Sequence, residues 1–345
     1  MTQALVTGGA GFFGGILKRR LLAEGIRVVS IDLQNDDESH PLLASVRGDI
    51  RDESLVSRIF RENQFDVVFH CAAILAHAVK DQSFLWTSNV DGTRIVAEGA
   101  RAHGVRNLIF TSSNCLWGRG FDYALAEPEA PCPVEIYGRS KWEGERVLDR
   151  YRHDLNVVIV RCPTIIDFGR LGLLSILFEF IHEGRRVWTI GAGDNRYQFI
   201  YAQDLADACI RAASYPASAV FHIGSDNVTT IAETYRHVIE KAGTGAKLAV
   251  LPKAPALAAM KVAYHLGISP LGPYHYKMIA ENFLFDTRKI KGELGWQPTL
   301  TNRDMLWRAY EFYSDNRTQI EMRKNVSAHR QAADMGAIRM LKWIS

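Results

Sequence analysis

An α/β fold built on a doubly wound parallel sheet is predicted by two features of the 345-residue sequence. The first is a series of short apolar runs separated by segments of helical pattern, an alternation typical of right-handed strand-helix-strand units. The second is that these runs are apolar throughout, so helices are expected on both faces of the sheet. The predicted strands are residues 4–6, 28–31, 67–69, 108–110 and 157–160.

A glycine turn follows the first predicted strand. Gly8, Gly11 and Gly14 stand three residues apart, directly before a segment of helical pattern. Gly8 permits a tight turn, Gly11 lets the backbone approach phosphate groups, and Gly14 lets the helix pack close to the strand. Because a helix N-terminus also attracts anions, the turn is predicted to bind the pyrophosphate of a dinucleotide. Phe12 and Phe13, which lie between the last two glycines, belong to this site.

An acidic residue follows the second predicted strand. Asp32 comes eighteen positions after Gly14, the place from which a carboxylate binds the hydroxyls of an adenosine ribose. A 2′-phosphate would meet this carboxylate at close range, and no arginine follows it closely. The expected cofactor is therefore NAD rather than NADP, and the fold class is a Rossmann-type sheet.

Composition argues against several other kinds of protein. Hydrophobic residues make up 47% and charged residues 23% of the chain, as in ordinary globular proteins, and the net charge of +3 is too small to indicate nucleic-acid binding. Five cysteines without a Cys-x-x-Cys pair, and no secretory signal, predict reduced thiols and a cytoplasmic location. No metal site is expected from the spacing of the histidines. The apolar stretches are too short to span a membrane, although residues 254–268 leave peripheral contact open.

Tyr137 and Lys141 form a Tyr-x-x-x-Lys pair in a segment of helical pattern. Residues four apart lie on one face of a helix, so the lysine ammonium can stand beside the phenol. This charge, together with that of an oxidised nicotinamide ring, is expected to lower the pKa of Tyr137 toward neutrality. Tyr137 is then predicted to take the proton of a secondary alcohol while NAD accepts the hydride.

These motifs resemble those of the extended short-chain dehydrogenase/reductase superfamily, the branch of NAD-dependent epimerases, dehydratases and 3β-hydroxysteroid dehydrogenases. The glycine spacing and the Tyr-x-x-x-Lys pair carry the resemblance, which covers about residues 3–310. Further matches, in the order of that branch, are Asp49-Ile50-Arg51-Asp52, His70-Cys71-Ala72-Ala73, Asn89-Val90-Asp91-Gly92-Thr93, Asp204-Leu205-Ala206-Asp207 and Leu294-Gly295-Trp296-Gln297-Pro298. The additional cofactor contacts that the resemblance implies are Asp49, Ile50, Ala72, Ala73, Asn89, Tyr137, Lys141 and Pro163.

The hydroxyl-rich end of residues 108–113 is expected to supply a third catalytic group, because ligands bind beyond the carboxyl ends of parallel strands. The resemblance assigns this role to Ser113, with Thr111 as the alternative, and implies a hydrogen bond to the developing carbonyl oxygen. Sugar 4,6-dehydratases carry an Asp-Glu pair directly after this hydroxyl, whereas Asn114 and Cys115 stand here. The resemblance therefore implies epimerisation, or net oxidation or reduction, rather than dehydration.

The substrate class stays open. Nucleotide-sugar enzymes of this branch carry an asparagine where this chain has Thr164 and an arginine where it has Tyr197, although Arg196 lies one position away. The apolar residues 251–273 resemble instead the corresponding part of 3β-hydroxysteroid dehydrogenases. The predicted function is a sugar or nucleotide-sugar 4-epimerase-like enzyme. The alternatives are a dehydrogenase of a hydrophobic alcohol and a non-catalytic dinucleotide sensor. Candidate substrate contacts are Ser113, Asn114, Thr164, Arg196 and Tyr197.

Two lobes are expected. Residues 1–163, with returning segments near 198–225, are predicted to form the NAD-binding domain, and residues 164–314 mainly a smaller α/β substrate lobe. Residues 315–345 are expected to be a tail or a docking helix. The resemblance also implies a homodimer that pairs through residues 84–103 and 140–152.

Overall fold

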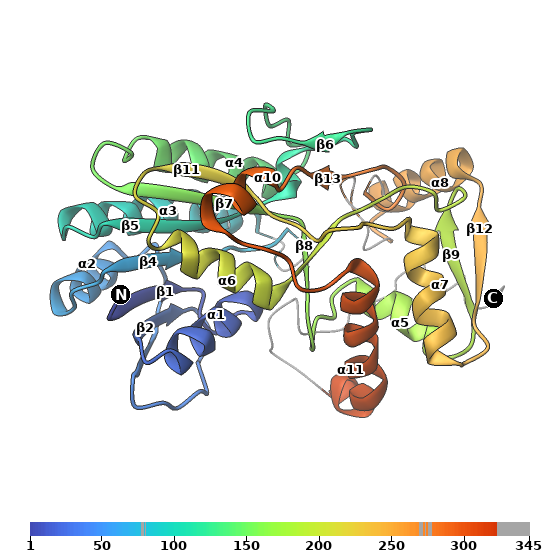
Figure 1. The fold of residues 1–345 in the computed structure, drawn as a ribbon, viewed down its shortest axis with the longest axis horizontal. Coiled ribbons are helices and arrows are strands. Elements are labelled where there is room, and N and C mark those ends of the chain that lie inside the picture. Colours follow the sequence, from blue (N-terminus) through green and yellow to red (C-terminus); the bar gives the residue numbers. More distant parts are fainter. Residues whose placement is uncertain (77–78, 80, 269–271, 273, 275–277, 323–345) are drawn as a thin grey trace.

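The computed structural model describes residues 1–322 except 77–78, 80, 269–271, 273 and 275–277. Its central feature is a seven-stranded parallel sheet of order β11-β7-β5-β4-β1-β2-β3 (Figure 1). The strands are β1 (Gln3–Thr7), β2 (Arg27–Asp32), β3 (Leu43–Arg47), β4 (Val67–His70), β5 (Asn107–Ser113), β7 (Asn156–Cys162) and β11 (Ala219–His222). Strand order reverses between β1 and β4, which is where such sheets open a ligand crevice. The predicted Rossmann-type α/β fold is confirmed.

Helices cover both faces of the sheet, because successive side chains of each strand point to opposite faces. On β1, Ala4 and Val6 join one hydrophobic core, whereas Leu5 joins the other. The first core includes α1 (Phe12–Ala23), α6 (Ala202–Ala212) and α10 (Arg288–Leu294). The second includes α2 (Glu53–Glu62), α3 (Gln82–Ala102) and α4 (Ile136–Asp149). The helices α3 and α4 pack on each other within the chain, and their pairing with a second subunit stays a prediction.

A smaller group of elements lies beside the large sheet (Figure 1). Three parallel strand pairs, β8 with β10, β9 with β12 and β6 with β13, accompany its helices. Its strands are β6 (Ala124–Leu125), β8 (Thr164–Ile166), β9 (Arg186–Ile190), β10 (Phe199–Tyr201), β12 (Lys247–Leu251) and β13 (Leu284–Phe285). Its helices are the 3-10 turn η1 (Asn114–Leu116), α5 (Leu174–His182), α7 (Ile231–Ala242), α8 (Lys253–His265) and α11 (Asn302–Met322). The domain boundaries stay a prediction.

The helix α11 packs on α5 and α7 and buries Ile320. Residues 315–322, expected in a tail or a docking helix, are therefore the last part of a packed helix, and residues 323–345 lie outside the described part of the chain. No helix among the described residues is long and apolar enough to cross a membrane.

A buried ion pair joins the large sheet to α4. The Arg161 guanidinium at the end of β7 donates to the Glu145 carboxylate, with Nε 3.0 Å from Oε1 and Nη2 2.7 Å from Oε2. The Ser112 hydroxyl also donates to Glu145, at 2.5 Å. Both ionic side chains are almost fully buried, so each charge depends on the other for compensation.

We expect Arg161→Met to lower the free energy of unfolding by about 3–5 kcal/mol, because it leaves the Glu145 carboxylate buried beside a single hydroxyl. Urea denaturation measures the change. The matched control is Arg146→Met, which removes an exposed pair with Glu143 and is expected to cost less than about 1 kcal/mol. Equal losses in the two variants would contradict the role given to the buried pair.

Candidate active site

The glycine turn between β1 and α1 has no room for side chains. Gly8 has a φ of +75°, and a Cβ there would lie 2.8 Å from the Cα of Ala72. A Cβ on Gly14 would lie 2.1 Å from the carbonyl oxygen of Gly8. Gly11 precedes α1 and supplies no side-chain cap. The turn therefore brings backbone and the positive end of a helix to one place, which suits a phosphate group.

Asp32 lies at the end of β2, beside this turn. Its Oδ2 accepts a hydrogen bond from the Ala10 amide at 3.1 Å, and its Oδ1 accepts one from the Gln34 amide at 2.9 Å. Both contacts hold the carboxylate at the cavity wall without neutralising its charge. The position fits the predicted contact with ribose hydroxyls.

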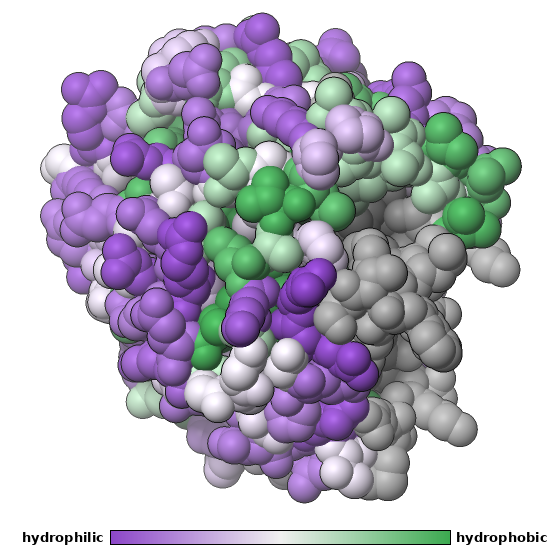
Figure 2. All heavy atoms as spheres, turned by 90° about the vertical axis from the view of Figure 1, so that its right-hand side faces the viewer, coloured by the Kyte–Doolittle hydropathy of each residue, from purple (hydrophilic) through white to green (hydrophobic). Residues whose placement is uncertain are grey.

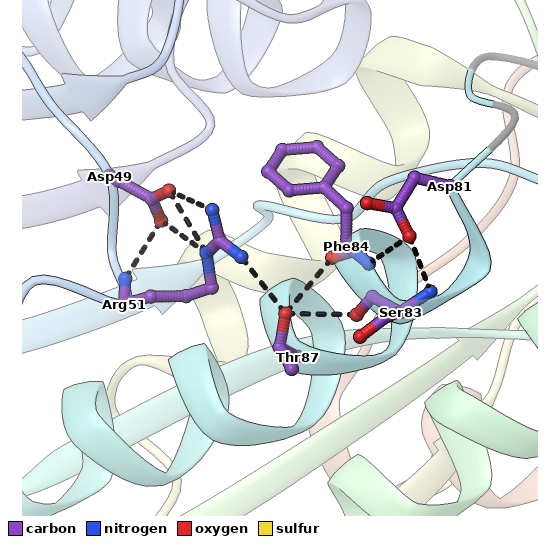
Figure 3. Close-up of polar contacts among 6 residues, drawn as sticks. All are labelled: Asp49, Arg51, Asp81, Ser83, Phe84 and Thr87. Atoms are coloured by element: carbon purple, nitrogen blue, oxygen red, sulfur yellow. Dashed lines mark hydrogen bonds and ion pairs between the residues drawn. The ribbon is translucent and has the colours of Figure 1, made fainter.

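Asp49 and Arg51 form a tight pair at the same end of the cavity (Figure 3). Burial raises the pKa of Asp49, but the hydrogen bonds and charge of Arg51 outweigh it and hold that pKa below its usual value. The guanidinium also donates to the Thr87 hydroxyl at 2.9 Å and lies 4.5 Å from the centre of the Phe84 ring. These contacts tie the loop that carries Asp49 and Ile50 to the start of α3.

A buried histidine, His70, supports residues that line the cavity. One ring nitrogen of His70 is 2.7 Å from the Thr7 hydroxyl and the other is 2.8 Å from the Thr93 hydroxyl. Thr7 in turn accepts from the Ala72 amide at 3.2 Å. Burial lowers the pKa of His70 to about 3. The ring is thus a neutral support that positions the backbone of Ala72 and Ala73 under the glycine turn.

Asn89 hydrogen-bonds neighbouring segments and is not among the described residues that line the cavity. Its amide accepts from the Ile74 N–H at 2.7 Å, and donates to the Ile74 carbonyl at 3.0 Å and to the Ser140 hydroxyl at 2.9 Å. It therefore connects the loop after Ala73 to α4. Its expected contact with the cofactor stays a prediction.

Tyr137 and Lys141 occupy the first two turns of α4, and Ser113 ends β5 opposite them. The Ser113 side chain hydrogen-bonds the Tyr137 phenol, which lowers the pKa of the phenol. Lys141 Nζ is buried 3.8 Å from the centre of the Phe110 ring. Burial lowers the pKa of Lys141 to about 8. The three residues predicted to be catalytic therefore share one cavity.

The expected lowering of the Tyr137 pKa includes the charge of a bound nicotinamide ring and stays a prediction. In the chain itself, burial outweighs every other influence and raises the pKa of Tyr137 well above its ordinary value. Arg170 and Ser113 lower it only in part. A shift toward neutrality would require more positive charge near the phenol than Arg170 supplies in the chain alone.

The hydroxyl groups of Thr111 and Ser113 on β5 have different hydrogen-bond partners. Thr111 donates to the Cys71 sulfur at 3.5 Å, whereas Ser113 Oγ accepts the Cys115 amide at 3.1 Å and lies beside the Tyr137 phenol. Ser113 is therefore better placed than Thr111 to polarise a substrate oxygen.

A cluster of neutral polar groups lies beyond Ser113. Asn114 donates to the Tyr197 phenol at 2.7 Å and accepts from the Tyr274 phenol at 2.8 Å, and Thr164 lies 3.0 Å from the Tyr197 oxygen. Glu135 accepts the Tyr274 amide at 2.8 Å, and burial raises the pKa of its carboxyl. Tyr274 and Glu135 come from segments without a recognisable motif, so no pattern in the sequence indicates either residue.

Arg170 is a second site residue that sequence reasoning missed. It lies in the loop between β8 and α5, its guanidinium carbon 5.8 Å from the centre of the Phe12 ring. Burial lowers its pKa to about 10, while the nearby Tyr137 and Tyr197 phenols oppose that change. Its buried Nε has no hydrogen-bond partner. A buried cation with an unused donor in this position suits an anionic ligand group.

One cavity of about 960 Å³ connects these groups, near the upper end of the usual size for ligand pockets. Its described lining omits Asn89 and Arg196; Arg196 is exposed, and its substrate contact stays a prediction. The other predicted residues in the lining are Gly8, Gly11, Phe12, Phe13, Gly14, Asp32, Asp49, Ile50, Ala72, Ala73, Ser113, Asn114, Tyr137, Lys141, Pro163, Thr164 and Tyr197.

Comparison with known proteins identifies the family. The model of the NAD dependent epimerase/dehydratase family matches residues 4–224. The chain belongs to this family. A UDP-glucose 4-epimerase of Mycolicibacterium smegmatis is 30% identical over 331 residues, which cover 90% of this chain and 98% of that one. The uncharacterized protein y4nG of Sinorhizobium fredii is 36% identical over 319 residues, 92% of this chain and 80% of that one.

A solved structure shows the same fold. The UDP-glucose 4-epimerase of Thermotoga maritima, crystallised with UDP-glucose, has a TM-score of 0.75 at 23% identity and covers 91% of this chain and 99% of that chain. Membership of the NAD-dependent epimerase/dehydratase family makes the chain an enzyme with NAD as its cofactor. The observed cavity fits this cofactor, since Gly8 and Gly14 leave space that a Cβ would fill and Asp32 stands beside them.

We expect NAD to bind this family member at least about 10²-fold more tightly than NADP, because Asp32 would repel a 2′-phosphate at close range. Asp32→Asn should narrow the preference to less than about tenfold. Calorimetric titration with both cofactors measures it. Asp37→Asn, which removes an exposed neighbouring charge, serves as the control and should leave the preference unchanged. Equal affinities in the unmodified protein would rule out the role of Asp32.

Proposed function

We propose that this enzyme is a 4-epimerase of a sugar or nucleotide sugar, with Tyr137 as its base. The observation that carries the proposal is the convergence of Ser113, Tyr137 and Lys141 on one cavity with the glycine turn. The relatives named as 4-epimerases support this reaction over the alternative of a hydrophobic alcohol dehydrogenase. The presence of both Tyr137 and Lys141 argues against a non-catalytic sensor.

The proposed chemistry follows from the placement of these side chains. Tyr137 accepts the proton of a sugar hydroxyl, and Ser113 donates a hydrogen bond to the oxygen as it becomes a carbonyl. When bound, NAD supplies the two-electron acceptor and donor for the reacting carbon. Tyr137 then returns the proton to the oxygen once the sugar has presented its opposite face. The Lys141 ammonium stabilises negative charge on the phenol in both directions.

The groups after Ser113 disfavour loss of water. The Asn114 amide is held by Tyr197 and Tyr274, and burial raises the pKa of the Cys115 thiol to about 11. Neither residue can deliver a proton to a leaving hydroxide as a carboxylic acid would. Glu135 is an acidic side chain beside this cluster, and it accepts the Tyr274 amide.

The proposal is tested by the products formed from UDP-glucose and UDP-N-acetylglucosamine. The purified protein is first analysed by mass spectrometry for retained NAD and then incubated with each sugar. A product of unchanged mass and altered configuration at C4 supports the proposal. Stoichiometric NADH would indicate a dehydrogenase, a product lighter by one water a dehydratase, and either would overturn it.

Ser113→Ala should lower kcat by about 10²–10³ with little change in KM, the effect of removing one donor to a developing oxyanion. The control is Thr111→Val, whose hydroxyl is directed to Cys71, with an expected loss of less than about fivefold in kcat. Steady-state kinetics on the same substrate measure both. A larger loss in Thr111→Val would indicate that Thr111, rather than Ser113, donates to the developing oxyanion.

A further inference from the structure

The cavity continues past the catalytic residues into the smaller group of elements. We name this part the apolar branch; it is lined from α5, β9 and α8 by Leu177, Phe180, Val187, Trp188, Ala259 and Met260. Figure 1 shows α5 and α8 on the side of the molecule away from α1 and the start of the large sheet. Because the branch and the catalytic residues line one cavity, the same ligand can occupy both.

Few polar side chains are available inside the apolar branch. The Thr189 hydroxyl donates to the carbonyls of Gly191, at 3.0 Å, and Ala249, at 3.3 Å. Tyr235 is buried, which raises the pKa of its phenol to about 12. Among the described residues that line the whole cavity, the cations are Lys141 and Arg170. Among the described residues, the walls of the apolar branch therefore offer few side-chain hydrogen-bonding groups to a nucleoside diphosphate.

The helix α8 is unusual because it is apolar and has no buried residue. One side lines the cavity through Ala256, Ala259 and Met260, while Val262 on another side is 59% exposed. Figure 2 shows apolar side chains gathered on this end of the molecule. Although α8 also carries Lys253, Lys261 and His265, its cavity-lining residues are apolar, so this side of the helix presents an apolar wall to a ligand.

Arg170 lines the same cavity as the catalytic residues and the apolar branch. Its guanidinium carbon lies 5.8 Å from the centre of the Phe12 ring, and the guanidinium interacts electrostatically with the Tyr137 and Tyr197 phenols. The loop that carries it leads into α5. The cavity thus combines a candidate base for an alcohol, a cation with a buried, unpartnered Nε and an apolar channel. This combination matches a ligand made of a sugar, an anionic link and a hydrophobic chain.

We infer that the sugar epimerised by this enzyme is carried on an apolar chain of isoprenoid type through a phosphate-containing link. The chain occupies the apolar branch, and the link lies at Arg170. This inference rests on the proposed function, because it takes the reacting sugar to lie at Tyr137. It adds that the carrier is a lipid rather than a nucleoside.

Binding to the NAD-loaded enzyme tests the branch without turnover. The probes are isopentenyl, geranyl and farnesyl diphosphate, which share one head group and differ in chain length, titrated by calorimetry. Affinity is expected to rise at least tenfold from the shortest to the longest chain, since each buried methylene contributes up to about fourfold. Equal affinities for the three probes would overturn the inference.

The matched variants are Ala259→Asp and Ala258→Asp, adjacent exposed positions on α8 of which only Ala259 lines the cavity among described residues. Ala259→Asp should weaken farnesyl diphosphate at least tenfold, and Ala258→Asp less than twofold. Arg170→Met should weaken all three probes by a similar factor. An unchanged urea midpoint shows that each variant is folded, and unchanged NAD affinity shows that the two α8 variants keep the cofactor site. Equal effects of the two α8 variants would contradict the assigned channel.

Turnover separates this inference from the proposed function. Glucose linked through diphosphate to farnesol is compared with UDP-glucose, and the farnesyl carrier is expected to give a KM at least tenfold lower. Tyr137-dependent epimerisation of UDP-glucose with the lower KM would overturn the inference and leave the proposed function intact. Chain-dependent binding without epimerisation of either sugar would overturn the proposed function while the apolar subsite stands.

Discussion

Tyr137→Phe is expected to reduce kcat by at least about 10³ while NAD affinity stays within about twofold of the original. The substitution removes the proton acceptor but keeps the ring that packs in the cavity. Ser113 and Lys141 stay in place, so the remaining rate measures what polarisation and binding achieve without a base. Single-turnover measurements with saturating sugar separate this chemical step from substrate binding.

Tyr197→Phe is the matched control for this prediction. Tyr197 is another buried phenol of the same cavity, but its hydroxyl is engaged by Asn114 and Thr164. Its loss should lower kcat by less than about tenfold, since it contributes positioning rather than proton transfer. If Tyr137→Phe keeps the original rate, the assigned mechanism is wrong; if Tyr197→Phe loses as much, the base is misassigned.

The parts of the site that sequence could predict are those set by local geometry. Gly8 and Gly14 are required by contacts within one turn and its neighbouring loop, and Tyr137 and Lys141 are related by a single helical repeat. The core strands were visible because they are buried on both faces. The edge strand β3 was not predicted, since its residues are partly or fully exposed and lack the apolar signal.

The remaining site depends on contacts between distant segments. Asn114 meets Tyr274 across 160 positions of sequence, and neither residue belongs to a pattern that indicates the other. Arg170 follows Gly169, whose φ is +78°, in a loop with no periodicity to place it. Arg196 was expected to contact substrate from its position near Tyr197, but adjacent residues of an extended segment point to opposite sides. One side chain therefore enters the cavity and the other is exposed.

Lys141→Met is expected to make the folded protein more stable and the enzyme less active. Burial lowers the pKa of Lys141 to about 8 from an ordinary value of 10.5, so the folded chain without added NAD carries an unfavourable charge at pH 7. Removing that charge should raise the free energy of unfolding by roughly 1–3 kcal/mol. Under the proposed mechanism activity should fall by at least about 10², because Lys141 is proposed to stabilise the phenolate of Tyr137.

The stability difference between Lys141→Met and the original protein should depend on pH. Between pH 8 and 10.5 the unfolded chain binds more protons at Lys141 than the folded chain, so the original protein gains stability as pH rises. The advantage of Lys141→Met should therefore be full at pH 7 and shrink through this window. Urea unfolding at pH 7 and pH 9.5, without added NAD, measures it, with Lys141→Arg as the variant that keeps the charge. A constant advantage at both pH values would show that packing, rather than the buried charge, separates the two proteins.

The rate of alcohol oxidation should rise with pH through the ionisation of Tyr137 in the NAD-loaded enzyme, and Lys141→Met should move that rise to higher pH.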